Sequence, residues 1–103
     1  MKMNRKIRNS WTKALRSGKY SQARGRLKDH DRHCCLGVLC ELAIKVGVIK
    51  RIRPDQEFLP RSVVKWAGLS GTNPEINVTR AASLNDRLRY SFERIADEIE
   101  AHL

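Results

Sequence analysis

The segment from Cys34 to Gly47 limits the fold of this chain more than any other. It opens with the longest apolar stretch of the sequence, seven residues from Cys34 to Cys40, which ends at Glu41. Apolar residues then continue at helical spacing, and the stripe they form consists of Leu36, Leu39, Cys40, Ala43, Val46 and Gly47. The pattern predicts a central buried helix. The stretch is far shorter than the roughly 20 residues of a membrane span, so we expect a soluble protein.

Gly37 lies inside this predicted helix. Glycine is less favourable there than alanine by about 1 kcal/mol, because it loses more backbone freedom on folding. The simplest explanation is another stretch of backbone that packs directly against this turn. We therefore expect a close backbone contact at Gly37.

Three further segments have apolar residues at helical spacing. The first ends before Gly18 and has a cationic outer side; its inward positions are Met3, Ile7, Trp11, Ala14 and Leu15, which makes Trp11 a core residue and not a platform for bases. The second follows Pro60, which suits a first helical turn, and ends at Gly68 or Gly71. The third follows Ser91, a good N-cap, and turns inward Phe92, Ile95, Ala96, Ile99 and Leu103.

The segments between these helices are short and contain turn residues. Tyr20–Leu27 is predicted to be a strand, and the polar residues 28–31 predict a short hairpin or an ordered loop. Glu75–Val78 is predicted to be extended, and residues 79–84 to form one or two helical turns that Asn85-Asp86 interrupts. The expected fold is α+β: one small domain over residues 1–103, mostly helical, with a central buried helix and a short hairpin or small sheet.

Positive charge is concentrated in the first third of the chain. The sequence has 21 Lys and Arg against 11 Asp and Glu, a net charge of +10, which excludes an acidic mimic of DNA and favours polyanionic partners. Residues 1–33 have a net charge of +9, whereas residues 70–103 have a net charge of −2. Solubility alone does not require such an uneven distribution, although a solvated cationic face is the alternative explanation.

The leading functional prediction is therefore non-enzymatic binding of nucleic acid, RNA or DNA, or of a nucleoprotein by a basic N-terminal face. Arginine suits this role because its guanidinium engages phosphate oxygens in pairs or stacks on bases. Tyr20 is placed to stack on an unpaired base, which would favour RNA or single strands. The predicted interface comprises Lys2, Arg5, Lys6, Arg8, Lys13, Arg16, Lys19, Tyr20, Arg24, Arg26, Lys28 and Arg32.

Two alternatives stay open. In the first, the protein is an inhibitor or adaptor that binds other proteins, and its positive charge steers it onto an acidic surface of a host enzyme or a defence complex. In the second, a small zinc- or thiol-dependent protein uses His30, His33, Cys34, Cys35 and Cys40. These five residues do not form two separated ligand pairs, and no catalytic motif accompanies them, so we expect buried free thiols, no metal, no cofactor and no catalytic residue.

Several motifs resemble small proteins of unknown role that bacteriophages and prophages encode. The most specific is CCLGVLC at 34–40; the others are Trp11 followed by LRSG, Leu59-Pro60, Trp66-x-Gly-Leu, Asn73-Pro74, Leu84-Asn85-Asp86 and Ser91-Phe92-x-x-Ile-Ala-Asp-x-Ile-Glu. The resemblance extends from Trp11 to the C-terminus. It implies an accessory phage protein in the host cytosol, with counter-defence such as an anti-CRISPR activity among its roles, and it assigns no catalytic residue.

Overall fold

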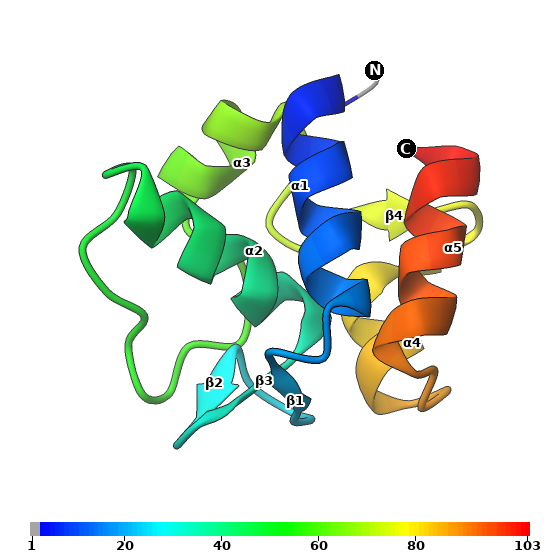
Figure 1. Ribbon diagram of the computed structural model, residues 1–103, viewed down its shortest axis with the longest axis horizontal. Coiled ribbons are helices and arrows are strands. Elements are labelled where there is room, and N and C mark those ends of the chain that lie inside the picture. Colours follow the sequence, from blue (N-terminus) through cyan, green and yellow to red (C-terminus); the bar gives the residue numbers. More distant parts are fainter. Residues whose placement is uncertain (1–2) are drawn as a thin grey trace.

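The central helix is present. The computed structural model describes residues 3–103, and α2 (Cys35–Lys45) packs in it against α1 (Arg5–Arg16) and α4 (Ala81–Asp86) (Figure 1). Every residue from Cys34 to Cys40 is buried, and so is Ala43. The apolar stretch therefore forms the middle of the hydrophobic core, as the sequence predicts.

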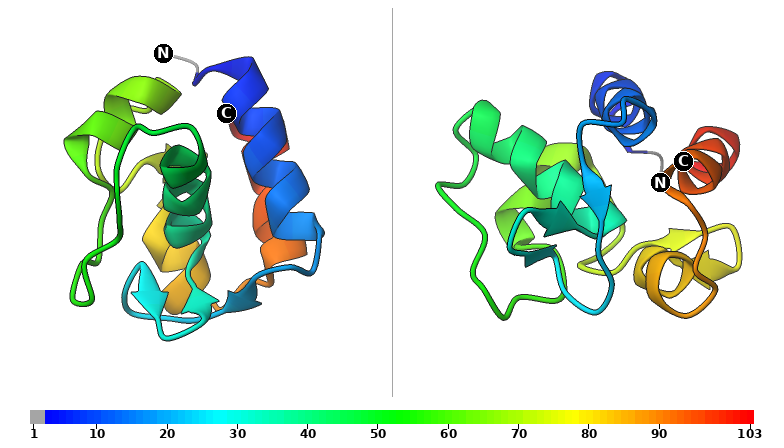
Figure 2. Two further views of the ribbon diagram at one scale, coloured as in Figure 1. Left: turned by 60° about the vertical axis from the view of Figure 1, so that its left-hand side comes forward. Right: turned by 60° about the horizontal axis from the view of Figure 1, so that its bottom comes forward.

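The two terminal helices lie side by side and run in opposite directions (Figures 1 and 2). The α1 helix begins where the Asn4 side chain accepts a hydrogen bond from the backbone N–H of Ile7 at 3.0 Å, and it ends just before Gly18, whose φ is +77°. The α5 helix (Phe92–His102) begins where Ser91 Oγ accepts a bond from the N–H of Arg94 at 3.2 Å. The predicted end of α1 before Gly18, the predicted N-cap at Ser91 and the inward stripes of both helices are confirmed.

Trp11 joins α1 to the central helix. Its side chain is fully buried, and its indole Nε1 donates a hydrogen bond to the carbonyl oxygen of Cys35 at 2.8 Å. This bond satisfies the one polar group of the indole inside the core. Trp11 is a core residue, as its place on the apolar stripe predicts.

The third helix, α3 (Arg61–Ala67), follows Pro60 and ends at Gly68, whose φ of +73° is a left-handed conformation that favours glycine. The N–H of Asn4 donates to the carbonyl of Ala67 at 2.8 Å, which fixes the start of α1 to the end of α3. The predicted helix after Pro60 is therefore confirmed.

The strands are very short. The hairpin of β2 (Lys28–Asp29) and β3 (Arg32–His33) is antiparallel, and β1 (Ser21–Gln22) pairs in parallel with β3, which gives the order β1-β3-β2. A second hairpin joins β4 (Glu75–Ile76) to β5 (Thr79–Arg80). The hairpin at 28–33 is confirmed, but the strand predicted over Tyr20–Leu27 is wrong beyond β1, because the chain turns at Gly25 with a φ of +91°.

The prediction that Asn85-Asp86 interrupts a helix is also wrong, because both residues belong to α4. The Asn85 side chain is fully buried and every polar atom in it has a partner. Its Oδ1 accepts from Gln22 Nε2 at 2.8 Å and from the N–H of Cys35 at 3.1 Å, and its Nδ2 donates to the carbonyl of Ala23 at 2.8 Å and to Asp86 Oδ1 at 2.7 Å. Asn85 thus caps α2 from a distant helix, since Cys34 offers no side-chain cap.

The close backbone contact expected at Gly37 is present. A Cβ atom at Gly37 would lie 1.8 Å from the carbonyl oxygen of Leu27, and that oxygen accepts a hydrogen bond from the N–H of Cys34 at 3.1 Å. The loop that leads into the β2–β3 hairpin therefore rests directly on α2, at a position where only glycine fits.

The α+β class is confirmed: over residues 3–103 the chain forms five helices and two small sheets around one core. None of the helices in this range combines the length and the apolar character that crossing a membrane requires.

Candidate nucleic-acid interface

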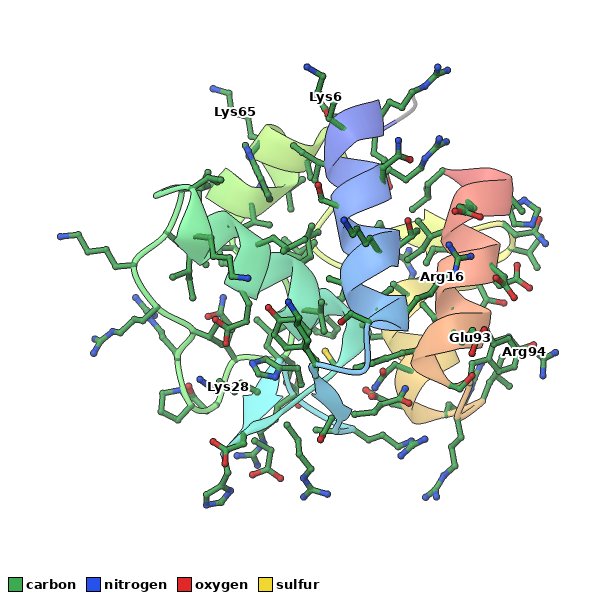
Figure 3. All side chains as sticks on the ribbon, in the orientation of Figure 1. Lys6, Arg16, Lys28, Lys65, Glu93 and Arg94 are labelled. Atoms are coloured by element: carbon green, nitrogen blue, oxygen red, sulfur yellow. The ribbon has the colours of Figure 1, made fainter. Side chains whose placement is uncertain are left out.

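The first group of predicted binding residues lies on α1. Trp11 and Leu15 of this helix face the core, whereas four of its cations are exposed: Arg5, Lys6, Lys13 and Arg16. Arg8 is half-buried, and Lys2 lies outside the described residues. Lys6 and Lys65 of α3 both project from the end of the molecule where α1 begins (Figure 3).

Arg16 is held by the acidic side of α5 (Figure 3). Its guanidinium lies 2.7 Å from Asp97 Oδ1 and 2.8 Å from Glu100 Oε2. The hydrogen bonds from Arg16 lower the pKa of Glu100, and the same contacts raise the pKa of Arg16. Asp97 and Glu100 are solvent-exposed and neutralise Arg16, so Arg16 is the weakest candidate of the α1 group for binding a phosphate.

The second group lies around the three-stranded sheet, at the far end of α1 from Lys6 (Figure 1). It consists of Lys19, Tyr20, Arg24, Arg26, Lys28 and Arg32. Two of its cations face carboxylates: Lys28 Nζ lies 3.5 Å from Glu41 Oε2, and Arg32 Nη2 lies 3.5 Å from Asp29 Oδ2. The predicted N-terminal interface therefore extends along α1 from Arg5 to Arg16 and continues around the three-stranded sheet.

Tyr20 is half-buried and packs against a buried histidine. The rings of Tyr20 and His33 are 5.3 Å apart between centroids and nearly perpendicular, at 86°. His33 Nε2 lies 2.6 Å from Glu41 Oε2, which fixes the histidine in place. Part of the Tyr20 ring is thus engaged within the protein, and base stacking by this residue stays a prediction.

A third group of cations comes from segments that contain no Asp or Glu at all, residues 42–54 and 58–74. These segments include the end of α2, most of the connector between α2 and α3 (residues 46–60), and α3 itself. Arg61 and Lys65 stand four residues apart on the exposed side of α3. With Lys6 they form a set that we call the carboxylate-free face: Lys6, Lys45, Lys50, Arg51, Arg53, Arg61 and Lys65, all exposed.

The connector, which contributes three cations to the carboxylate-free face, contacts the segment that holds the second group of cations. The N–H of Leu27 donates to the carbonyl of Gln56 at 2.8 Å, and Arg26 Nη1 donates to the carbonyl of Pro54 at 3.4 Å. A hollow of about 430 Å³ is lined on the connector by Lys50, Arg51 and Arg53 and by no carboxylate. Another of about 370 Å³ lies between the connector and the hairpin, lined by Arg26 and Lys28 but also by Asp29. The positive surface is therefore densest along the connector.

Sequence reasoning missed six of the seven residues of this face, because it counted charge only by thirds of the chain. The missed residues are Lys45, Lys50, Arg51, Arg53, Arg61 and Lys65. The signal was present in the sequence: residues 42–54 and 58–74 carry these cations and not one carboxylate. The structure agrees with this signal: in the part of the chain that it describes, no ion pair involves any of these six cations.

The structure places the histidines and cysteines of the zinc- or thiol-dependent alternative in separate surroundings. Within residues 3–103 no group of three or more His, Cys, Asp and Glu side chains is placed to hold a metal ion. His30 is exposed, with Nδ1 2.9 Å from Asp29 Oδ1, whereas His33 directs Nε2 to Glu41. Burial raises the pKa of Cys34 to about 11 and that of Cys40 to about 12, and it raises the pKa of Cys35 well above its ordinary value. All three thiols are thus held in the neutral form.

We expect the native protein at pH 7 to react slowly with Ellman's reagent and the protein unfolded in urea to react rapidly at Cys34, Cys35 and Cys40, because the thiolate is the reactive species. The raised thiol pKa values also predict a pH dependence. Their contribution to stability is complete below pH 9.0 and declines as pH rises from there towards about 11 for Cys34. Fast stoichiometric labelling of a native thiol at pH 7 would favour thiol chemistry instead.

Residues 3–103 match a family described as a domain of unknown function (DUF8296), and the chain belongs to that family. No curated protein and no solved structure matches the chain.

Proposed function

We propose that this member of the DUF8296 family binds nucleic acid, RNA or DNA, or a nucleoprotein through its carboxylate-free face, and that it does so without catalysis. One observation supports this most strongly: of the seven exposed cations of this face, all but Lys6 come from residues 42–54 and 58–74, which contain no Asp or Glu. Uncompensated cations on a continuous surface bind phosphates by releasing counterions, whatever the base sequence.

The proposal shifts the interface along the chain. Lys6 of the N-terminal set stays in it, and Arg26, which lines the hollow between the connector and the hairpin, extends it beyond the connector. Arg16 leaves it, because Asp97 and Glu100 neutralise its charge. The interface thus combines residues from both halves of the sequence.

The test compares two variants that each remove two positive charges. Arg51→Gln/Arg53→Gln changes the carboxylate-free face, and Arg87→Gln/Arg89→Gln changes exposed arginines between α4 and α5. We expect the first variant to bind RNA and DNA at least about tenfold more weakly than the unaltered protein at low salt, as measured by fluorescence anisotropy. The second should bind within about twofold of it, since net charge alone is not the cause. An equal loss of affinity in both variants would show that the carboxylate-free face is not the binding surface.

The resemblance to phage and prophage proteins extends the proposal to a biological setting. In that setting the protein acts in the host cytosol as an accessory phage product, and binding of nucleic acid or of a nucleoprotein serves counter-defence or regulation. Co-purification from infected cells with and without nuclease distinguishes a nucleic-acid ligand from a protein target, because only a protein target survives nuclease treatment.

A further inference from the structure

An apolar hollow lies within the carboxylate-free face, among α1, α2 and α3. It has a volume of about 330 Å³, and its apolar lining consists of Ile7, Leu42, Val46 and Trp66. Val46 is 64% exposed, and Ile7, Leu42 and Trp66 are half-buried. Ligand sites in proteins are commonly concave and mostly apolar, so a surface hollow lined by one exposed and three half-buried apolar side chains is a candidate binding site.

The rim of the hollow is cationic. Lys6 of α1 and Lys45 of α2 both line it, and no Asp or Glu does. Lys65 precedes Trp66 on α3 and projects from the same end of the molecule as Lys6 (Figure 3). The occupant that this arrangement fits is therefore flat or apolar at its centre and negatively charged at its edges.

We propose that the hollow receives an unpaired base of a single-stranded nucleic acid, with Trp66 in contact with the base and Lys6 and Lys45 in contact with the flanking phosphates. The inference rests on the proposed function and names its substrate class. Aromatic side chains on a basic surface are the common means by which proteins hold single strands, because every base has a π-face. In a duplex the bases are stacked and paired, so they cannot enter the hollow.

One observation favours a nucleic acid over an acidic peptide, and a second favours it over a membrane. The cations do not stop at the rim but continue along the connector and α3, through Lys50, Arg51, Arg53 and Arg61. A peptide anchored by one apolar side chain needs only the two lysines, whereas a strand with a phosphate at every nucleotide uses the whole series. The hollow is also concave, which suits a projecting base better than the surface of a membrane.

Tryptophan fluorescence tests the contact directly, because the chain has two tryptophans and Trp11 is fully buried. The probes are an oligothymidylate and an oligouridylate of about 12 nucleotides, a length within the usual site size, and a duplex of equal phosphate content. We expect both single strands to quench Trp66 and to bind at least about tenfold more tightly than the duplex. The quenching should disappear in Trp66→Leu.

A matched pair of valine variants tests the hollow itself. Val46→Asp places a carboxylate in it, and Val78→Asp places one on an even more exposed valine, 86% accessible, in the β4–β5 hairpin. We expect Val46→Asp to weaken single-strand binding at least about tenfold, the loss of one base–aromatic contact, while duplex binding falls by no more than about threefold. Val78→Asp should leave both nearly unchanged.

The remaining outcomes distinguish failure of the single-strand inference from failure of the proposed function. Equal binding of single strands and duplex without quenching would overturn the inference but leave the proposed function intact. Failure of every nucleic acid to bind would overturn both. If a labelled peptide of alternating leucine and glutamate bound in a manner that depends on Val46, and the oligonucleotides did not, the hollow would be a protein-docking site and the inference would be wrong.

Discussion

Replacing Gly37 with alanine is expected to lower the free energy of unfolding by about 3 kcal/mol or more, the largest effect of any conservative substitution discussed. The new Cβ would lie 1.8 Å from the carbonyl oxygen of Leu27, which is backbone and cannot rotate away. Overpacking of this kind typically costs about 1–3 kcal/mol, and separating Leu27 from α2 also breaks its hydrogen bond with Cys34, worth about 1 kcal/mol. The better helix propensity of alanine offsets only about 1 kcal/mol.

The measurement is thermal or urea unfolding followed by circular dichroism. A loss of 3 kcal/mol corresponds to a decrease in Tm of roughly 12–24 °C for a domain near 100 residues. Gly71→Ala is the matched control, because a Cβ there meets no atom within 4 Å and its backbone is not left-handed. If both variants melted at the same temperature, the backbone contact at Gly37 would not exist as described.

Replacing Asn85 with alanine is expected to cost about 2–4 kcal/mol. The substitution removes the cap of α2, worth about 1 kcal/mol, and leaves the buried N–H of Cys35 and the carbonyl of Ala23 without their 3.1 and 2.8 Å partners. Each buried polar group that loses its partner adds about 1–3 kcal/mol, part of which relaxation recovers. Urea unfolding measures the total, and hydrogen exchange locates it, since the Cys35 amide should lose protection first.

Asn9→Ala is the control for Asn85, because Asn9 is exposed on α1. Surface substitutions of this kind change stability by no more than about 0.5 kcal/mol. An Asn85→Ala protein as stable as the Asn9→Ala protein, with unchanged exchange at Cys35, would show that the buried network does not organise the junction of α2 and α4.

The helices were predictable where apolar spacing determines them. The stripes of Trp11 and Leu15, of Leu36 and Leu39, and of Ile95 and Ile99 all face the core. Gly37 was predictable for another reason: a glycine that weakens a helix requires a compensating contact, and the carbonyl of Leu27 provides it. These inferences use the spacing of apolar residues along one helix, or the low helix propensity of glycine, and both can be read from the sequence.

The errors arise where distant residues determine the local structure. Asn85 resembles a helix breaker, but its partners Cys35 and Gln22 lie 50 and 63 positions away and satisfy its side chain within α4. The strand predicted over Tyr20–Leu27 is reduced to β1 because the chain turns at Gly25, and Leu27 then lies against α2 at Gly37 and bonds to the connector through Gln56. The helix and strand propensities of these segments do not indicate such contacts with distant residues.

The sequence alone leads to the prediction of a basic interface, whereas the positions of its cations relative to one another follow only from the fold. A net charge of +10 is sufficient to predict a polyanionic partner. That Arg16 is neutralised by Asp97 and Glu100, more than 80 positions away, follows only from the pairing of α1 with α5. That Lys6 and Lys45 line one hollow likewise depends on how the helices pack.

The salt dependence of nucleic-acid binding tests the central claim most directly. If about six cations contact phosphates, the logarithm of the binding constant should fall with the logarithm of salt concentration with a slope of about −4 to −5. In Arg51→Gln/Arg53→Gln the slope should become shallower by about 1.5–2, one phosphate contact for each arginine, while Arg87→Gln/Arg89→Gln retains the full slope. An identical slope in all three proteins, or a slope near zero, would contradict the claim that the carboxylate-free face binds nucleic acid.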